Sequence, residues 1–132
     1  MYEIVEHTAD IGLKIKSDGL ENAFREAALG MLSLMIDIEK VEKKFSVDVN
    51  IKADNLESLL VRFLTEILYI FEVERFVYSD LKVEIKDNSL NAELFGENYN
   101  RSKHGSKLLI KAVTYHMISV KENGEIFIIF DI

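Results

Sequence analysis

The chain has 132 residues, 48% hydrophobic and 30% charged, a length and composition that allow a buried core. It contains no cysteine, which excludes disulfides, thiolate metal sites and thiol nucleophiles. The net charge of −7 disfavours direct, tight nucleic-acid binding, because such binding requires a basic face. Since we find no signal-peptide pattern and no apolar run near the ~20 residues of a membrane span, we expect one cytoplasmic domain over residues 1–132, without membrane contact.

The first third of the chain predicts two short strands, residues 2–6 and 11–16, separated by the polar segment His7–Asp10. Apolar residues at helical spacing then predict a helix to about Met35. Asp18 and Glu21 fit a capping box at its start.

The middle of the chain begins with the clearest strand pattern, residues 45–53, in which apolar and polar residues alternate. A second amphipathic helix follows to about Val73, with Asp54 and Glu57 as its capping box. Strands are predicted at residues 76–86 and 90–95, and a polar loop at residues 97–106.

Residues 110–120 predict a strand rich in β-branched and aromatic residues. Regular alternation would place Thr114 and His116 on one face and Lys111 on the other. Buried polar groups need partners, so Thr114 and His116 are either a hydrogen-bonded core pair or part of a site. Asn123-Gly124 predicts a hairpin turn into a final strand, residues 125–132.

Two strands, a helix, a strand, a helix and four strands define an α+β protein. We expect the two helices to pack on one face of a mixed or antiparallel sheet.

Carboxylates suggest the most specific chemistry. Asp131 lies near the end of an apolar strand, where a carboxylate is costly unless it is satisfied, and the carboxylate of Ile132 is beside it. If the first and last strands are neighbours, Asp10 could join them around a hard cation such as calcium or magnesium. The alternative is a solvated aspartate at a frayed terminus. Three histidines could also converge on zinc, although their spacing does not demand it; they are His7, His104 and His116.

Several segments together resemble the archease family over essentially the full chain. They are residues 7–12 (HTADIG), the helix at 55–69, Gly96-Glu97 with Lys103-His104, residues 110–116, and Asp131-Ile132. The resemblance implies a strand-helix-strand-strand module with an inserted strand-helix-two-strand unit. It also implies that Asp10, Asp131 and Ile132 bind calcium or another hard divalent cation. The family favours Asp where Asn100 stands and an acidic residue where Leu109 stands.

By the same resemblance, the chain is expected to activate the RtcB-type tRNA-splicing RNA ligase, which loads a histidine with GMP from GTP. It would promote guanylylation and multiple turnover without being an enzyme itself. The alternatives are a chaperone-like modulator of tRNA-modifying enzymes such as methyltransferases, and an independent metal hydrolase, which the lack of a clear nucleophile disfavours. Beyond the metal ligands, the candidate functional residues are His7, Glu97, His104, Lys111, Thr114 and His116. We expect Thr114 and His116 to form a polar cluster beside the metal, with Lys111 available to an anionic group.

Overall fold

The computed structural model describes residues 1–6 and 10–132. Its elements follow the predicted order, with the addition of three short helical turns, η1, η2 and α3. They are β1 (Tyr2–Glu6), β2 (Asp10–Lys16), α1 (Leu20–Met35), η1 (Ile38–Lys40), β3 (Phe45–Lys52), α2 (Leu56–Tyr69), η2 (Ile70–Glu74), β4 (Phe76–Lys86), β5 (Ser89–Asn98), α3 (Arg101–His104), β6 (Ala112–Val120) and β7 (Glu125–Asp131).

The strands form two antiparallel sheets, which confirms the α+β class but corrects the expectation of one sheet. A four-stranded sheet has the order β1-β2-β7-β6, and a three-stranded sheet has the order β3-β5-β4. The second sheet belongs entirely to the β3-α2-β4-β5 segment, which is inserted between α1 and β6. The strand-helix-two-strand insertion is therefore present and builds a layer of its own.

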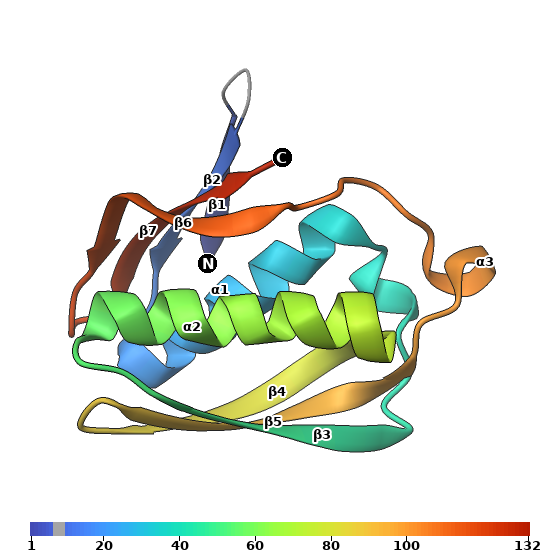
Figure 1. Cartoon of the computed structure of the whole chain (residues 1–132), viewed down its shortest axis with the longest axis horizontal. Helices are drawn as coiled ribbons and strands as arrows, with labels where there is room; N and C mark the ends of the chain where they lie inside the picture. The colour runs from blue at the N-terminus through green and yellow to red at the C-terminus, as the bar shows by residue number, and fades with distance from the viewer. Residues whose placement is uncertain (7–9) are drawn as a thin grey trace.

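Helices α1 and α2 lie between the two sheets (Figure 1). Helix α1 contacts β2 and β4, one strand from each sheet, and α2 contacts β6 and β3 in the same way. Phe24 of α1 and Phe63 of α2 are fully buried, with their ring centroids 6.3 Å apart. Apolar residues thus cover more than one side of each helix, as a middle layer requires. No helix in the described ranges is long and apolar enough to cross a membrane.

Both predicted capping boxes are wrong in detail. Gly19 precedes α1 without a side-chain cap, and Glu21 instead accepts the backbone N–H of Ile85 on β4 at 2.8 Å. At α2 the cap is Asn55, whose Oδ1 accepts the N–H of Ser58 at 2.8 Å. In each case the cap is one residue later than the acidic residue predicted, at Gly19 instead of Asp18 and at Asn55 instead of Asp54.

Candidate metal centre

Asp10 and Asp131 lie directly opposite each other at the end of the β2–β7 pair. Their neighbours Ile11 and Phe130, also a cross-strand pair, are 4% and 0% exposed and face the core. Since side chains alternate along a strand and opposite residues share a face, Asp10 and Asp131 project together from the outer face of the sheet. The first and last strands are not neighbours, because β2 lies between β1 and β7; the two carboxylates meet because Asp10 lies on β2, the second strand.

The chemistry of this pair suits a hard cation. Like charges directly opposite each other in a sheet destabilise it. Asp10 Oδ1 is buried and has no hydrogen-bond partner among the described residues, so one carboxylate oxygen is left unsatisfied. Residues 1–6 and 10–132 contain no cluster of three or more His, Cys, Asp or Glu side chains that could hold a metal. The carboxylate of Ile132, next to Asp131, is the third ligand that the resemblance implies, and it stays a prediction.

The start of β6 lies beside this pair. Ala112 is the Cα partner of Asp131, and the N–H of Lys111 donates to the Asp131 carbonyl at 2.8 Å. The Lys111 side chain is exposed. The hydroxyl of Thr114 donates to the Ile129 carbonyl at 2.9 Å and accepts the N–H of His116 at 3.3 Å. Thr114 thus has a clear structural role, whereas Lys111 is held at its backbone by Asp131 and exposes its side chain.

The prediction that side chains alternate regularly along residues 110–120 is wrong in the middle of β6. The register passes from Thr114 opposite Ile129 to Ser119 opposite Phe127, so the intervening residues of β6 face Ile128 alone. Met117 adopts a left-handed backbone with φ of 55°. This bulge exposes Tyr115, His116 and Met117, and the predicted pairing of Thr114 and His116 on one flat face does not hold.

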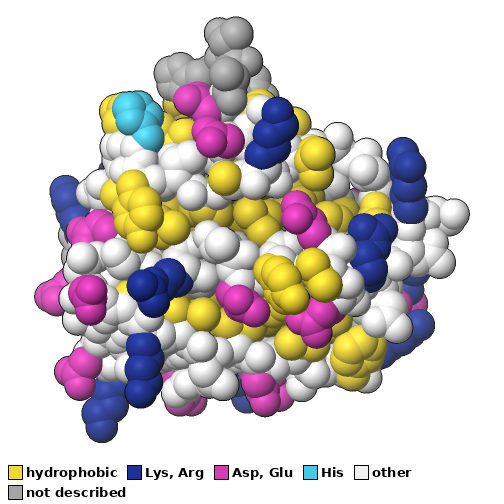
Figure 2. Space-filling model, in the orientation of Figure 1, with side chains coloured by type: hydrophobic (Ala, Val, Ile, Leu, Met, Phe, Trp, Pro, Cys, Tyr) yellow, Lys and Arg dark blue, Asp and Glu magenta, His cyan; other side chains and the backbone are white. Residues whose placement is uncertain are grey.

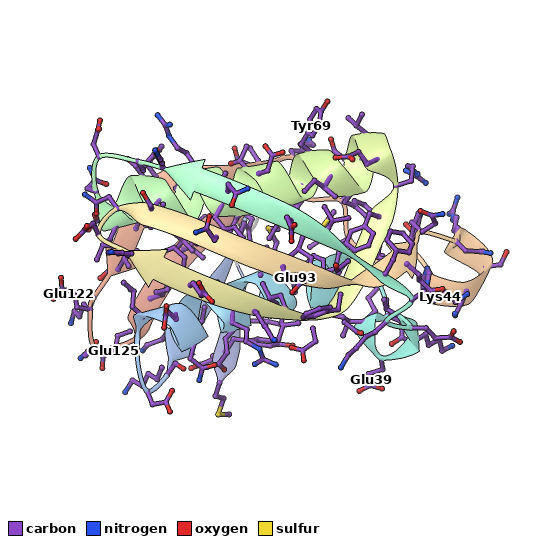
Figure 3. The ribbon with its side chains drawn as sticks, turned by 90° about the horizontal axis from the view of Figure 1, so that it is seen from below. Glu39, Lys44, Tyr69, Glu93, Glu122 and Glu125 are labelled. Carbon is purple, nitrogen blue, oxygen red and sulfur yellow. The ribbon has the colours of Figure 1, made fainter. Side chains whose placement is uncertain are left out.

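Glu97 and His104 form a separate, buried cluster at the α3 end of the molecule. Glu97 accepts the backbone N–H of Glu42 at 2.8 Å, and the amines of Lys103 and Lys44 lie 2.8 and 3.3 Å from its oxygens. Figure 3 shows Lys44 at the end of the sheet beside α3. The hydrogen bond from the backbone N–H of Glu42, followed by the hydrogen bond from the Lys103 side-chain amine, holds the pKa of Glu97 well below its ordinary value of 4.5.

His104 is fully buried in this cluster, and its ring is locked in one tautomer. The N–H of Asn100 donates to Nδ1 at 3.0 Å, so the proton lies on Nε2, which donates to Glu97 at 2.9 Å. With both ring nitrogens in use, His104 is unsuited to bind zinc, and the three-histidine hypothesis is wrong for this residue. Because α3 contacts no strand of the four-stranded sheet, the cluster is also apart from Asp10 and Asp131.

The departure from the family pattern at Asn100 is structurally neutral. Asn100 caps α3, and its Oδ1 accepts the N–H groups of Ser102 and Lys103 at 2.9 and 3.3 Å. An aspartate would accept the same two bonds. Leu109, the other departure, is 62% exposed and costs no packing.

One candidate residue, His7, lies outside the described residues. The residues that hold Glu97 are distant from it along the chain. Glu42 and Lys44, which hold Glu97, were not singled out, because a charged connector carries no periodic signal for contact with a strand some fifty residues further on. The only local sign that Glu42 and Lys44 share a contact is their spacing of two residues, with Lys43 between them.

Cationic and anionic side chains are interspersed over the described part of the face in Figure 2. Together with the net charge of −7, this distribution gives the chain an acidic overall character. The fold and the carboxylate pair define a small α+β protein of two antiparallel sheets around two helices, with a candidate cation site at one sheet end.

Comparison with known proteins identifies the family. The model of the archease protein family (MTH1598/TM1083) matches residues 2–132, and the chain belongs to this family. It is 38% identical to the protein archease of Pyrococcus furiosus, over 91% of this chain and 87% of that protein. It is 37% identical to the protein archease of Pyrobaculum neutrophilum, over 97% of this chain and 90% of that one.

Solved structures agree with the fold. The solution structure of protein 1598 of Methanobacterium thermoautotrophicum has a TM-score of 0.78 and 34% identity, covering 99% of this chain and 98% of that one. An archease of Thermotoga maritima, described as a possible chaperone, has a TM-score of 0.61 and 16% identity, covering 100% of this chain and 98% of that one, and supports the fold alone.

Proposed function

We propose that this chain binds a hard divalent cation, calcium foremost, and activates a tRNA-splicing RNA ligase. The observation that carries the proposal is the β2–β7 register, which sets Asp10 opposite Asp131, with one Asp10 oxygen that has no partner in residues 1–6 and 10–132. Asp10, Asp131 and the carboxylate of Ile132 would hold the cation. When bound, the cation neutralises the carboxylates and offers a Lewis-acidic centre on the outer face of the sheet.

The rest of the site supports an accessory role rather than catalysis by this chain. Two polar groups of β6 and the residue before it lie near the carboxylate pair. The Lys111 N–H donates to the Asp131 carbonyl and the Thr114 hydroxyl donates to the Ile129 carbonyl, so both hold β6 on β7. The Lys111 side chain remains exposed beside the site and is suited to an anionic group such as a phosphate. An acidic protein also complements a ligase that must be basic enough to hold RNA.

Incubating the purified ligase with GTP and a low proportion of this chain tests the proposal. We expect faster guanylylation of the ligase histidine and continued turnover, and we expect Asp10→Asn and Asp131→Asn to remove both effects. Asp54→Asn, an exposed carboxylate before α2, is the matched control. No gain with the unmodified chain would disprove ligase activation. Suppressed aggregation of a tRNA methyltransferase in the same preparation would then favour the chaperone-like alternative.

A further inference from the structure

The two edges of the three-stranded sheet differ in how their backbone groups are satisfied. On the β4 edge, Glu21 accepts the N–H of Ile85 at 2.8 Å, and Arg25 donates to the carbonyl of Leu81 at 3.3 Å. Side chains of α1 therefore occupy the hydrogen-bonding groups that a further strand would need. The β4 edge is protected against pairing.

The β3 edge is largely open. The Lys52 carbonyl accepts a hydrogen bond from Arg62 of α2 at 3.2 Å and points away from β5. The next N–H, of Ala53, points to the β5 side and donates to the Asn88 carbonyl in the β4–β5 turn. By alternation, the N–H and C=O groups of Ser46, Asp48 and Asn50 also point outward. Across the described chain, these outward groups have no hydrogen-bond partner. A regular strand with such an edge is a template for another strand.

A groove between β3 and α2 would receive the side chains of an added strand. It has a volume of about 680 Å³ and is lined by Asn50, Ile51, Lys52, Val61, Arg62, Thr65 and Glu66. Figure 3 shows β3 at the margin of the sheet, with α2 behind it. The charges here are balanced locally, Lys52 and Arg62 against Asp48 and Glu66, so this edge avoids the repulsion that the net charge of −7 would otherwise impose.

We propose that β3 pairs with β3 of a second copy of this chain, antiparallel and centred on Asn50, to form a symmetric dimer. In this register Asp48 of each copy faces Lys52 of the other on the outer face, and the two Asn50 amides meet on the axis. The Lys52 carbonyl would exchange its exposed hydrogen bond from Arg62 for one from the Asp48 N–H of the other copy. On the inner face Val49 meets Ile51 next to the groove. A two-fold interface requires such self-complementarity, since each contact occurs twice.

Neighbouring registers are less favourable. Centring the pair on Asp48 places two aspartates opposite each other. Centring it on Val49 pairs Asp48 with Asn50 and Ser46 with Lys52, which leaves no ion pair. Charge complementarity therefore favours a second copy of this chain as the strand that pairs with β3, and it favours the register centred on Asn50. The dimer is independent of the ligase proposal, because β3 and the candidate metal centre lie in different sheets.

A charge swap tests the register by analytical ultracentrifugation. Asp48→Lys and Lys52→Glu each place like charges opposite each other twice, so we expect each to weaken the dimer about tenfold, and the double variant to restore it. Both positions are exposed, and Asp48 already faces Glu93 within the chain, so the single variants should keep their thermal midpoints. A chain that stays monomeric up to about 1 mM, or a double variant that stays weak, would overturn the proposal.

Cross-linking gives an independent readout on a chain without native cysteine. Facing Cα atoms of a hydrogen-bonded antiparallel pair are about 5.5 Å apart, within disulfide range. With oxidised glutathione as electron acceptor, Asn50→Cys should form a disulfide-linked dimer rapidly. Lys52→Cys and Asn91→Cys, the latter on the central strand, should link only at the rate of random collision. Equal rates for the three variants would exclude this register.

Discussion

The β2–β7 register sets two like-charged side chains, Asp10 and Asp131, directly opposite each other, an arrangement that destabilises a sheet. Asp10→Asn should therefore leave the metal-free protein as stable as before, or more stable by up to about 1 kcal/mol. Calcium at 100 times its dissociation constant should stabilise the unmodified chain by about 2.7 kcal/mol and leave Asp10→Asn unchanged. Thermal melts with calcium and with chelator measure both effects. An equal calcium shift in the two proteins would place the ion elsewhere.

Glu97 makes a pH-dependent contribution to stability. Its pKa in the folded chain lies below the ordinary value of 4.5, so its carboxylate stabilises the fold above about pH 4.5, and this contribution is lost as the pH falls below that value. Gln keeps the shape but not the charge that Lys103 and Lys44 neutralise. Glu97→Gln should cost about 1.5–3 kcal/mol at pH 7.

Urea unfolding at pH 7 and pH 3 checks this expectation. The difference in the free energy of unfolding between Glu97→Gln and the unmodified chain should be smaller at pH 3. Glu84→Gln, an exposed glutamate on β4, is the control and should change little at either pH. A gap that does not depend on pH would mean that the carboxylate charge is unimportant.

At the level of single elements, the periodicity of apolar residues predicted strands and helices correctly where those residues pack on one side of the element. Alternation predicted β3 within one residue, and the helical stripes predicted the span of α1. The β6 bulge had no such signal, because residues 115–118 contain neither Gly nor Pro and still read as a strand. The helix caps were displaced for a related reason: Glu21 is used by a β4 backbone group that is distant in sequence.

The bulge can be tested at Met117, which holds a left-handed backbone while its side chain is 67% exposed. A non-glycine residue there costs about 1–2 kcal/mol. Met117→Gly should therefore keep or raise stability, by up to about 1 kcal/mol, despite the extra flexibility of glycine when unfolded. His116→Gly, next to it and also exposed but without a positive φ, should lower stability. Denaturant midpoints compare the two variants, and equal losses would contradict the strained backbone.

At the scale of the whole molecule, the sequence predicted the element order and the α+β class but not the division into two sheets. Alternation shows which face of a strand is buried, yet it does not show which strand is its neighbour. The candidate site was partly predictable, since a carboxylate near the end of the apolar β7 pattern is unusual. That it faces Asp10, rather than another residue, depends on register and emerges only from the folded sheet.

Because α1 and α2 each contact both sheets, the two sheets should unfold together. Phe24 and Phe63 join the helices at the centre of the middle layer, so Phe24→Ala should cost about 3–5 kcal/mol. Native-state hydrogen exchange should then show equal losses of protection at Leu13 in β2 and Leu94 in β5. Phe45→Ala, at a site 45% exposed on the β3 edge, should cost much less. Loss of protection at Leu94 alone would mean that the inserted sheet opens independently, and that the helices do not couple the two layers.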